Sequence, residues 1–172
     1  MEQKNETTNA VVLTEEQEAL MKKVKSGTLL KEQEELTIFD LPVGIRKKVL
    51  LDYIATGYLC DAAELKIFDL PADERKEILL TYAAKYCFCD EADLKIFDLP
   101  QEERKEVLLA SIAYGSVLCS EAEAKIFDLP KDARDEILAA YMAEDGVEAL
   151  GDKARTLFDQ LSEEEQEKIL GE

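Results

Sequence analysis

The sequence predicts an all-α protein, an α-solenoid of either hand with about five tandem two-helix repeats and a closing helix. The motif Ile-Phe-Asp-Leu-Pro occurs four times, beginning at Ile38, Ile67, Ile96 and Ile126. A degenerate copy begins at Leu157, so the motif phenylalanines recur at intervals of 29 to 31 residues. A fixed period of this length is typical of arrays in which each unit stacks on the next.

A long helix is expected after each motif. The motif proline suits a first helical turn, because the amide that proline lacks would have no partner there. Apolar residues then recur at helical spacing, as in Leu70, Ile78 and Tyr82, and place one stripe on the core side. Three of these helices are expected to end at a left-handed glycine, namely Gly57, Gly115 and Gly146.

A shorter helix is expected to end at each motif. Capping boxes mark several helix starts. In such a box the side chain of the N-cap residue accepts a bond from the amide three positions on, and the side chain at that position accepts one from the N-cap amide. Asp90 is also expected to cap a helix. The boxes are Thr14 with Gln17, Asp61 with Glu64, Ser120 with Glu123, and Ser162 with Glu165.

The domain organisation follows from the repeats. Residues 1–12 show no periodicity and are expected to be a mobile N-terminal tail. Residues 13–172 are expected to form a single repeat domain, whose units span about 13–40, 41–69, 70–98, 99–128 and 129–159, with the closing helix at 162–170. No apolar run is long enough to cross a membrane and no secretory segment is evident, so we expect a cytoplasmic protein.

The apolar residues of the motif are expected to form the core. They are Phe39, Phe68, Phe97, Phe127, Phe158, Leu41, Leu70, Leu99 and Leu129. Three of the four cysteines, Cys60, Cys89 and Cys119, each precede a motif phenylalanine by eight residues, where the fourth repeat has Leu150. A position that accepts cysteine or leucine predicts buried thiols in a reducing compartment, so no metal or other cofactor is expected.

The charge balance limits the classes of partner. The chain has 39 acidic and 21 basic residues, a net charge of −18. Such a chain is repelled by phosphates, so binding to nucleic acid or to an anionic membrane is not expected. Histidine, the commonest general base, is absent, which leaves an enzyme only through carboxylates or cysteines.

Two sets of charged residues are candidates for binding a partner. One is the arginine that follows each motif aspartate by six residues, namely Arg46, Arg75, Arg104 and Arg134. Each arginine could pair with the motif aspartate, expected to cap the long helix, or with a neighbouring acid. Alternatively, the arginines could form a stripe that binds carboxylates of a peptide.

The other set lies in residues 141–172, which carry −7 in 32 residues against −11 in the preceding 140. A concentrated field of one sign attracts a basic partner, although the end of a repeat array also needs a polar cap. The candidate residues are Glu144, Asp145, Glu148, Glu163, Glu164 and Glu165.

The sequence therefore favours a non-enzymatic module that binds a protein or peptide. It does not determine the identity of the partner or the oligomeric state. An exposed apolar stripe would support this interpretation. The alternatives are an acidic antagonist, such as a nucleic-acid mimic or an immunity-type protein, and a carboxylate-based enzyme. Tyr53, Tyr82 and Tyr141 share one repeat position, which Ser111 interrupts, and are expected in the core unless they line a groove.

Overall fold

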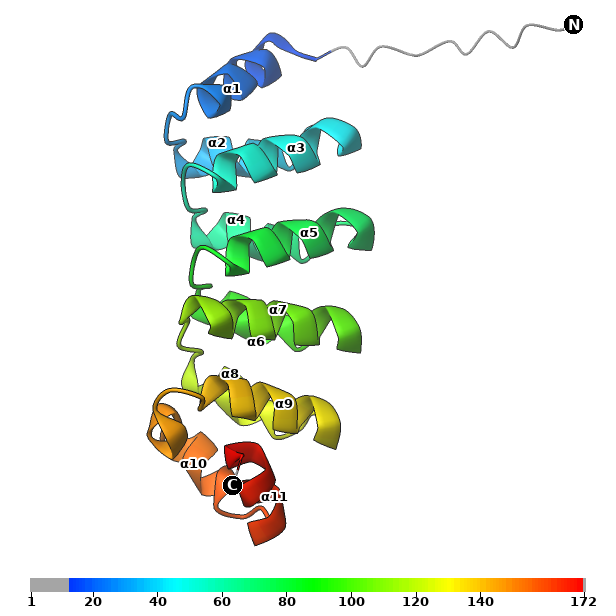
Figure 1. Cartoon of the computed structure of the whole chain (residues 1–172). Helices are drawn as coiled ribbons and strands as arrows, with labels where there is room; N and C mark the ends of the chain where they lie inside the picture. The colour runs from blue at the N-terminus through cyan, green and yellow to red at the C-terminus, as the bar shows by residue number, and fades with distance from the viewer. Residues whose placement is uncertain (1–12, 172) are drawn as a thin grey trace, which may run out of the picture. The chain divides into compact units, whose positions relative to one another are not determined.

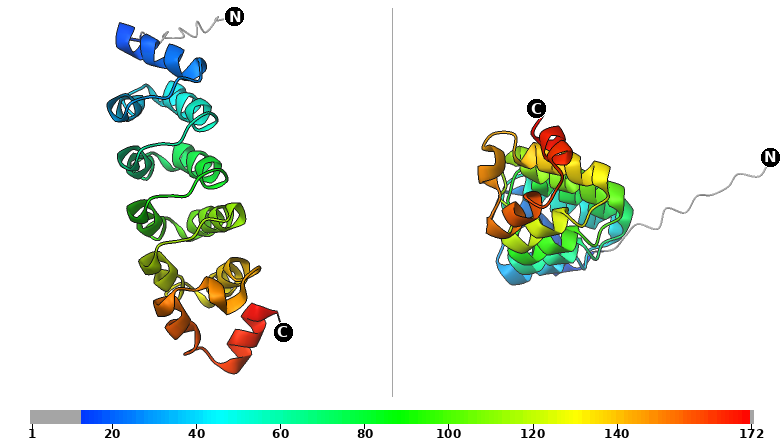
Figure 2. Two further views of the ribbon diagram at one scale, coloured as in Figure 1. Left: turned by 90° about the vertical axis from the view of Figure 1, so that its left-hand side faces the viewer. Right: turned by 90° about the horizontal axis from the view of Figure 1, so that it is seen from below.

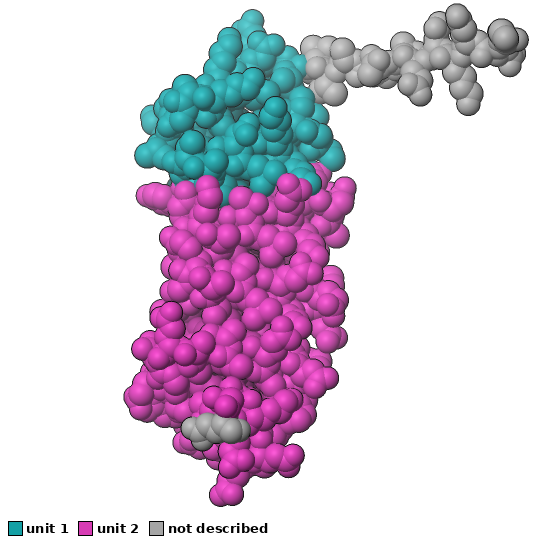
Figure 3. Space-filling model, in the orientation of Figure 1, with its two compact units in different colours: residues 1–57 teal, residues 58–172 magenta. Residues whose placement is uncertain are grey.

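The structure, a computed structural model, describes residues 13–171. Over this range the chain forms eleven α-helices and one 3-10 helix and contains no β-strand (Figure 1). The predicted all-α class is therefore confirmed. The predicted tail, residues 1–12, lies outside the described residues. The helices fall into two compact units, which divide the chain after Gly57 (Figure 3).

The first unit contains α1 (Glu15–Lys25), α2 (Glu32–Ile38) and α3 (Val43–Ile54). The predicted capping box opens α1: the Gln17 amide donates to Thr14 Oγ1 at 3.2 Å, and the Thr14 amide donates to Gln17 Oε1 at 3.0 Å. Helix α3 packs against both α1 and α2. The core of this unit includes Ile38, Leu50 and Ile54, whose side chains are fully buried.

The second unit alternates short and long helices. The short ones are α4 (Asp61–Ile67), α6 (Asp90–Ile96), α8 (Ser120–Ile126) and α10 (Asp152–Phe158). The long ones are α5 (Ala72–Ala83), α7 (Gln101–Tyr114), α9 (Lys131–Tyr141) and α11 (Glu163–Leu170), with the 3-10 helix η1 (Gly146–Ala149) before α10. Within this unit each short helix packs against the next short one and each long helix against the next long one, in two rows (Figure 2).

The fourth repeat has a different register from the one that the sequence suggested. The amide of Leu161 donates to the carbonyl of Phe158 at 3.0 Å, as that of Leu70 donates to Ile67 at 3.1 Å. Phe158 therefore occupies the position of the motif isoleucine. By the same count Gly151 is the N-cap of α10, as Cys119 is of α8, so Leu150 does not occupy the cysteine position.

The predicted core needs one correction. Phe39, Phe68, Phe158 and the four motif leucines are buried, whereas Phe97 and Phe127 are only half-buried. Phe88 covers Phe68 at a ring-centroid distance of 6.3 Å, but the next repeat has Leu118 in place of Phe88. The Phe97 ring instead lies beneath the ammonium group of Lys125, which is 5.8 Å from the ring centroid.

Of the three glycines expected to end long helices, only Gly115 does so, at a φ of 88° as the C-cap of α7. Helix α3 already ends at Ile54 and α9 at Tyr141. Gly57 is required for space instead, because a Cβ there would lie 2.9 Å from Leu29 Cδ2.

Candidate functional site

The repeat arginines connect successive long helices. Arg75 of α5 donates through Nε and Nη2 to the two carboxylate oxygens of Glu103 on α7, both at 2.8 Å. Arg134 of α9 likewise donates to Glu165 of α11 at 2.8 Å. The hydrogen bonds from Arg75 to Glu103 raise the pKa of its guanidinium group. These two arginines are therefore engaged within the chain.

The motif aspartates do not cap the long helices, which corrects that interpretation. The N-caps of these helices are the motif prolines, and none has a side-chain capping bond. Each aspartate lies two residues before its N-cap, too early for its carboxylate to serve as the cap. All four are exposed: Asp40, Asp69, Asp98 and Asp128.

A buried carboxylate at the centre of the repeat was not predicted from the sequence. Glu64, on α4, accepts a hydrogen bond from the hydroxyl of Tyr82 at 2.5 Å and another from the amide of Cys89 at 2.8 Å. Glu123, on α8, accepts from Tyr141 at 2.7 Å and from the Gly151 amide at 3.0 Å. Each carboxylate thus joins its own short helix, the following long helix and the start of the next short helix.

The first unit contains the same pair. The Tyr53 hydroxyl donates to Glu35 Oε1 at 2.8 Å and accepts from the Leu30 amide at 3.2 Å. The predicted core position of the tyrosines therefore holds for Tyr53 and Tyr82, which are 1% exposed, while Tyr141 is half-buried. Burial and the adjacent carboxylate raise the pKa of Tyr82 far above its ordinary value.

The third repeat lacks this tyrosine. Asp93 accepts from the Cys119 amide at 2.9 Å, but Ser111 occupies the tyrosine position, and its buried hydroxyl has no hydrogen-bond partner among the described residues. Burial raises the pKa of Asp93 to about 6, with smaller contributions from Asp90 and Glu64, and the Cys119 amide opposes the rise. This repeat therefore holds a buried acid with fewer stabilising partners than its neighbours.

The cysteines are less buried than the sequence suggested. Cys60, Cys89 and Cys119 are half-buried N-caps of α4, α6 and α8, and Cys87 is exposed. The predicted caps Asp61, Asp90 and Ser120 are instead the first helical residues. Burial raises the pKa of the Cys89 thiol to about 11. Across residues 13–171 no group of three or more Cys, Asp or Glu side chains is placed to hold a metal ion.

The six candidate acids near the C-terminus differ in their surroundings. Glu165 completes the predicted capping box with Ser162 and accepts from Lys131 and Arg134, so its pKa falls to about 2. Glu148 pairs with Arg155 at 3.0 Å yet remains exposed. The other four are exposed: Glu144, Asp145, Glu163 and Glu164.

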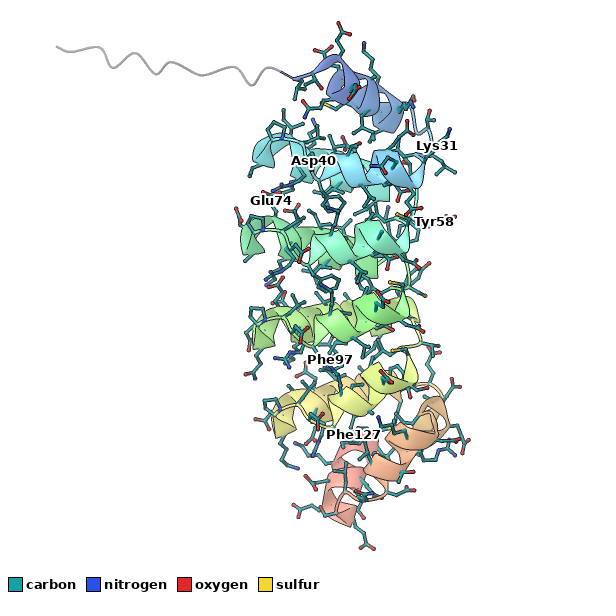
Figure 4. All side chains as sticks on the ribbon, turned by 180° about the vertical axis from the view of Figure 1, so that it is seen from behind. Lys31, Asp40, Tyr58, Glu74, Phe97 and Phe127 are labelled. Atoms are coloured by element: carbon teal, nitrogen blue, oxygen red, sulfur yellow. The ribbon has the colours of Figure 1, made fainter. Side chains whose placement is uncertain are left out.

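An exposed apolar side chain recurs in the loops before three of the four short helices of the second unit, α4, α6 and α8. Tyr58, Cys87 and Val117, which we call the loop row, each lie two residues before a helix N-cap. Tyr58 is 66% and Val117 77% exposed. The loops before α6 and α8 touch, because Cys87 Sγ lies 3.5 Å from the hydroxyl of Ser116. Figure 4 shows Tyr58 at the edge of this unit opposite Glu74.

Acidic side chains accompany the loop row. Asp61, Asp90, Glu91 and Glu121 are exposed at the starts of α4, α6 and α8. Asp61, Cys89, Asp90 and Glu91 line a shallow hollow of about 420 Å³. The row therefore combines exposed apolar groups with negative charge.

Comparisons with protein-family models, with curated proteins and with solved structures find no match to this chain. Within residues 13–171, none of the helices has both the length and the apolar character needed to cross a membrane.

Proposed function

We propose that the chain is an α-solenoid of about five tandem two-helix repeats that binds an extended, basic segment of a partner protein. The observation that carries this proposal is the loop row of the second unit. Its residues recur before α4, α6 and α8, and most of the Tyr58 and Val117 side chains lies in water. Large exposed apolar side chains arranged in register are typical of a protein-binding surface.

The spacing suggests the form of the partner. Packed helices lie about 8–10 Å apart, so successive members of the row are separated by about that distance. A polyproline II segment advances about 3.1 Å per residue and turns once every three residues, so side chains three positions apart share a face at a separation of about 9 Å. A segment with an apolar residue at every third position would match the row.

Charge complementarity suggests the residues between the apolar ones. The exposed acids at the starts of the short helices attract lysine or arginine, and the net charge of −18 speeds the encounter with a cation at low salt. The proposed partner segment is therefore basic as well as apolar.

The test uses a peptide of about twelve residues that repeats leucine, lysine and alanine, because in a polyproline II conformation its leucines share one face at the spacing of the row. Isothermal titration should show saturable binding. A peptide of the same composition with all leucines adjacent should bind at least tenfold more weakly, and the double variant Tyr58→Ser with Val117→Ser should lose binding. Leu170→Ser, which removes an exposed apolar residue of α11, is the matched control. Equal binding of both peptides, or unchanged binding by the double variant, would reject the proposal.

The exposed acids near the C-terminus favour a second candidate, an acidic antagonist of a basic protein. Glu144, Asp145, Glu163 and Glu164 would make the contact. Their neutralisation to Gln and Asn should then abolish binding of a basic partner and remove its salt dependence, while the loop-row variant should bind normally. The reverse result would assign binding to the row.

A further inference from the structure

One arginine of the repeat departs from its equivalents. In the second unit the arginine at the fourth position of a long helix pairs with an acid at the third position of the next: Arg75 with Glu103, and Arg134 with Glu165. Arg104 lies at the same position of α7, and α7 packs against α9. The third residue of α9 is Ala133. The expected carboxylate is therefore missing at this junction.

The Arg104 guanidinium finds no substitute within the described chain. Its Nε atom is buried and has no hydrogen-bond partner, and no acid of residues 13–171 forms an ion pair with it. Asp135, the buried acid of α9, is already bound by Arg134 and Lys168. Glu136 on the same helix pairs with Lys105.

The missing group has a defined size. Glutamate extends beyond the alanine Cβ by one methylene and a carboxylate, and these are the heavy atoms of acetate. A buried guanidinium N–H without an acceptor is unfavourable, and a carboxylate that accepts two of its hydrogen bonds is its strongest common partner. We propose that Arg104 and Ala133 form a binding site for a carboxylate supplied from outside the chain, either a free small acid or an acidic side chain of a partner.

This site differs from the loop row in residues and in ligand charge, so the two proposals can fail separately. The row takes a basic segment, whereas Arg104 takes an anion. The negative charge of the whole chain opposes the approach of any anion, so we expect a small acid to bind in the millimolar range.

The test follows the Nε–H signals of arginine by NMR in the full chain, which has five arginines. Sodium acetate should shift the Arg104 signal saturably, with acetamide and sodium chloride at equal ionic strength as controls. Arg104→Lys identifies the signal, and Arg75, whose Nε already donates to Glu103, should not respond. The absence of a saturable Arg104 shift, or an equal shift with acetamide, would overturn the proposal.

Ala133→Glu supplies the carboxylate from the chain itself. This variant should show the shifted Arg104 signal without acetate and should no longer respond to acetate, whereas the isosteric Ala133→Gln should not show the carboxylate shift. An undiminished acetate response in Ala133→Glu would mean that the acid binds elsewhere and would overturn the proposal.

A second arm separates the two sources. A short, end-capped peptide with one glutamate is compared with acetate, and its glutamine analogue is the control. Binding at least tenfold tighter than acetate would identify a side chain of a partner as the ligand. Binding weaker than acetate would identify a free acid.

Discussion

The junction between α5 and α7 and the junction between α7 and α9 present the same helix faces but different chemistry. At the first, Arg75 and Glu103 form a pair whose side chains are 15% and 8% exposed. At the second, Ala133 stands at the position of the acid, and the buried Nε of Arg104 has no hydrogen-bond partner in the part of the chain that the structure describes. Helix packing is therefore retained without the ion pair. The polar pairs add to an interface whose packing depends on apolar residues such as Leu79 and Leu108, both fully buried.

The row of short helices shows a parallel difference. Glu64 has a tyrosine and an amide as donors, while over residues 13–171 Asp93 accepts a hydrogen bond only from the Cys119 amide. The changes at Asp93, Ser111 and Ala133 all fall between the second copy of the motif and the first turn of α9. Departures from the repeat are thus concentrated in one part of the second unit, where polar groups are left with fewer partners.

The largest expected effect on stability comes from removing the acid of the α5–α7 junction, so that this junction resembles the one between α7 and α9. Glu103→Ala leaves the Arg75 guanidinium part-buried without its acid, and should lower the free energy of unfolding by about 3 kcal/mol. Urea unfolding followed by circular dichroism measures the change. A loss below about 1 kcal/mol would show that the two junctions are energetically equivalent despite their different contacts.

The Asp93 carboxyl should make stability fall as the pH rises. Its folded pKa of about 6 lies above the unfolded value, so between about pH 4 and pH 6 the folded state holds the extra proton and loses relative stability with increasing pH. Asp93→Asn should therefore match the wild type near pH 4 and exceed it near pH 7 by roughly 2–3 kcal/mol. The control is Asp90→Asn, on the exposed first residue of α6. A difference that does not vary with pH would contradict the assignment.

The tyrosine–carboxylate bond is tested by Tyr82→Phe, which removes the hydroxyl and keeps the ring. Loss of a buried hydrogen bond to a carboxylate should cost about 2 kcal/mol. Tyr114→Phe, at an exposed site on α7, provides the control and should have no measurable effect. If Tyr82→Phe unfolds like the wild type, the tyrosine donor that Glu64 has and Asp93 lacks does not contribute to stability.

The smallest expected effect concerns an exposed ion pair at the first junction. Lys76 and Glu106 are 2.8 Å apart, with side chains 43% and 45% exposed. Glu106→Ala should cost less than about 1 kcal/mol, and added salt should reduce the difference further. A cost equal to that of Glu103→Ala would mean that charge, rather than burial, separates the two junctions.

The sequence was sufficient to predict the helices because their signals are local. The proline at the start of each long helix, the apolar stripe and the capping boxes at Thr14 and Ser162 each act within a few residues. The register of the fourth repeat was predicted wrongly because Phe158 resembles the motif phenylalanine. Only the hydrogen bond from Leu161 to Phe158 shows that it occupies the isoleucine position.

The buried acids could not be recognised by local rules. Glu64 looked like the second member of a capping box with Asp61, whereas its carboxylate reaches Tyr82 and Cys89. An acid eighteen residues before each repeat tyrosine was the available signal, and it requires the fold to be interpreted. The loop row was missed because its three members are different residue types, so no sequence motif marks their shared position.

The variable length of the repeat is confined to one segment. From each N-cap to the last residue of its short helix the count is always seven, as in Cys60 to Ile67 and Gly151 to Phe158. From that residue to the next N-cap it is 22 for Ile67 to Cys89, 23 for Ile96 to Cys119 and 25 for Ile126 to Gly151. The long helix and the loop after it have together absorbed every insertion, since α5 has 12 residues and α7 has 14. The loop is the natural place to graft a foreign epitope, because added residues there leave the packed helices in phase.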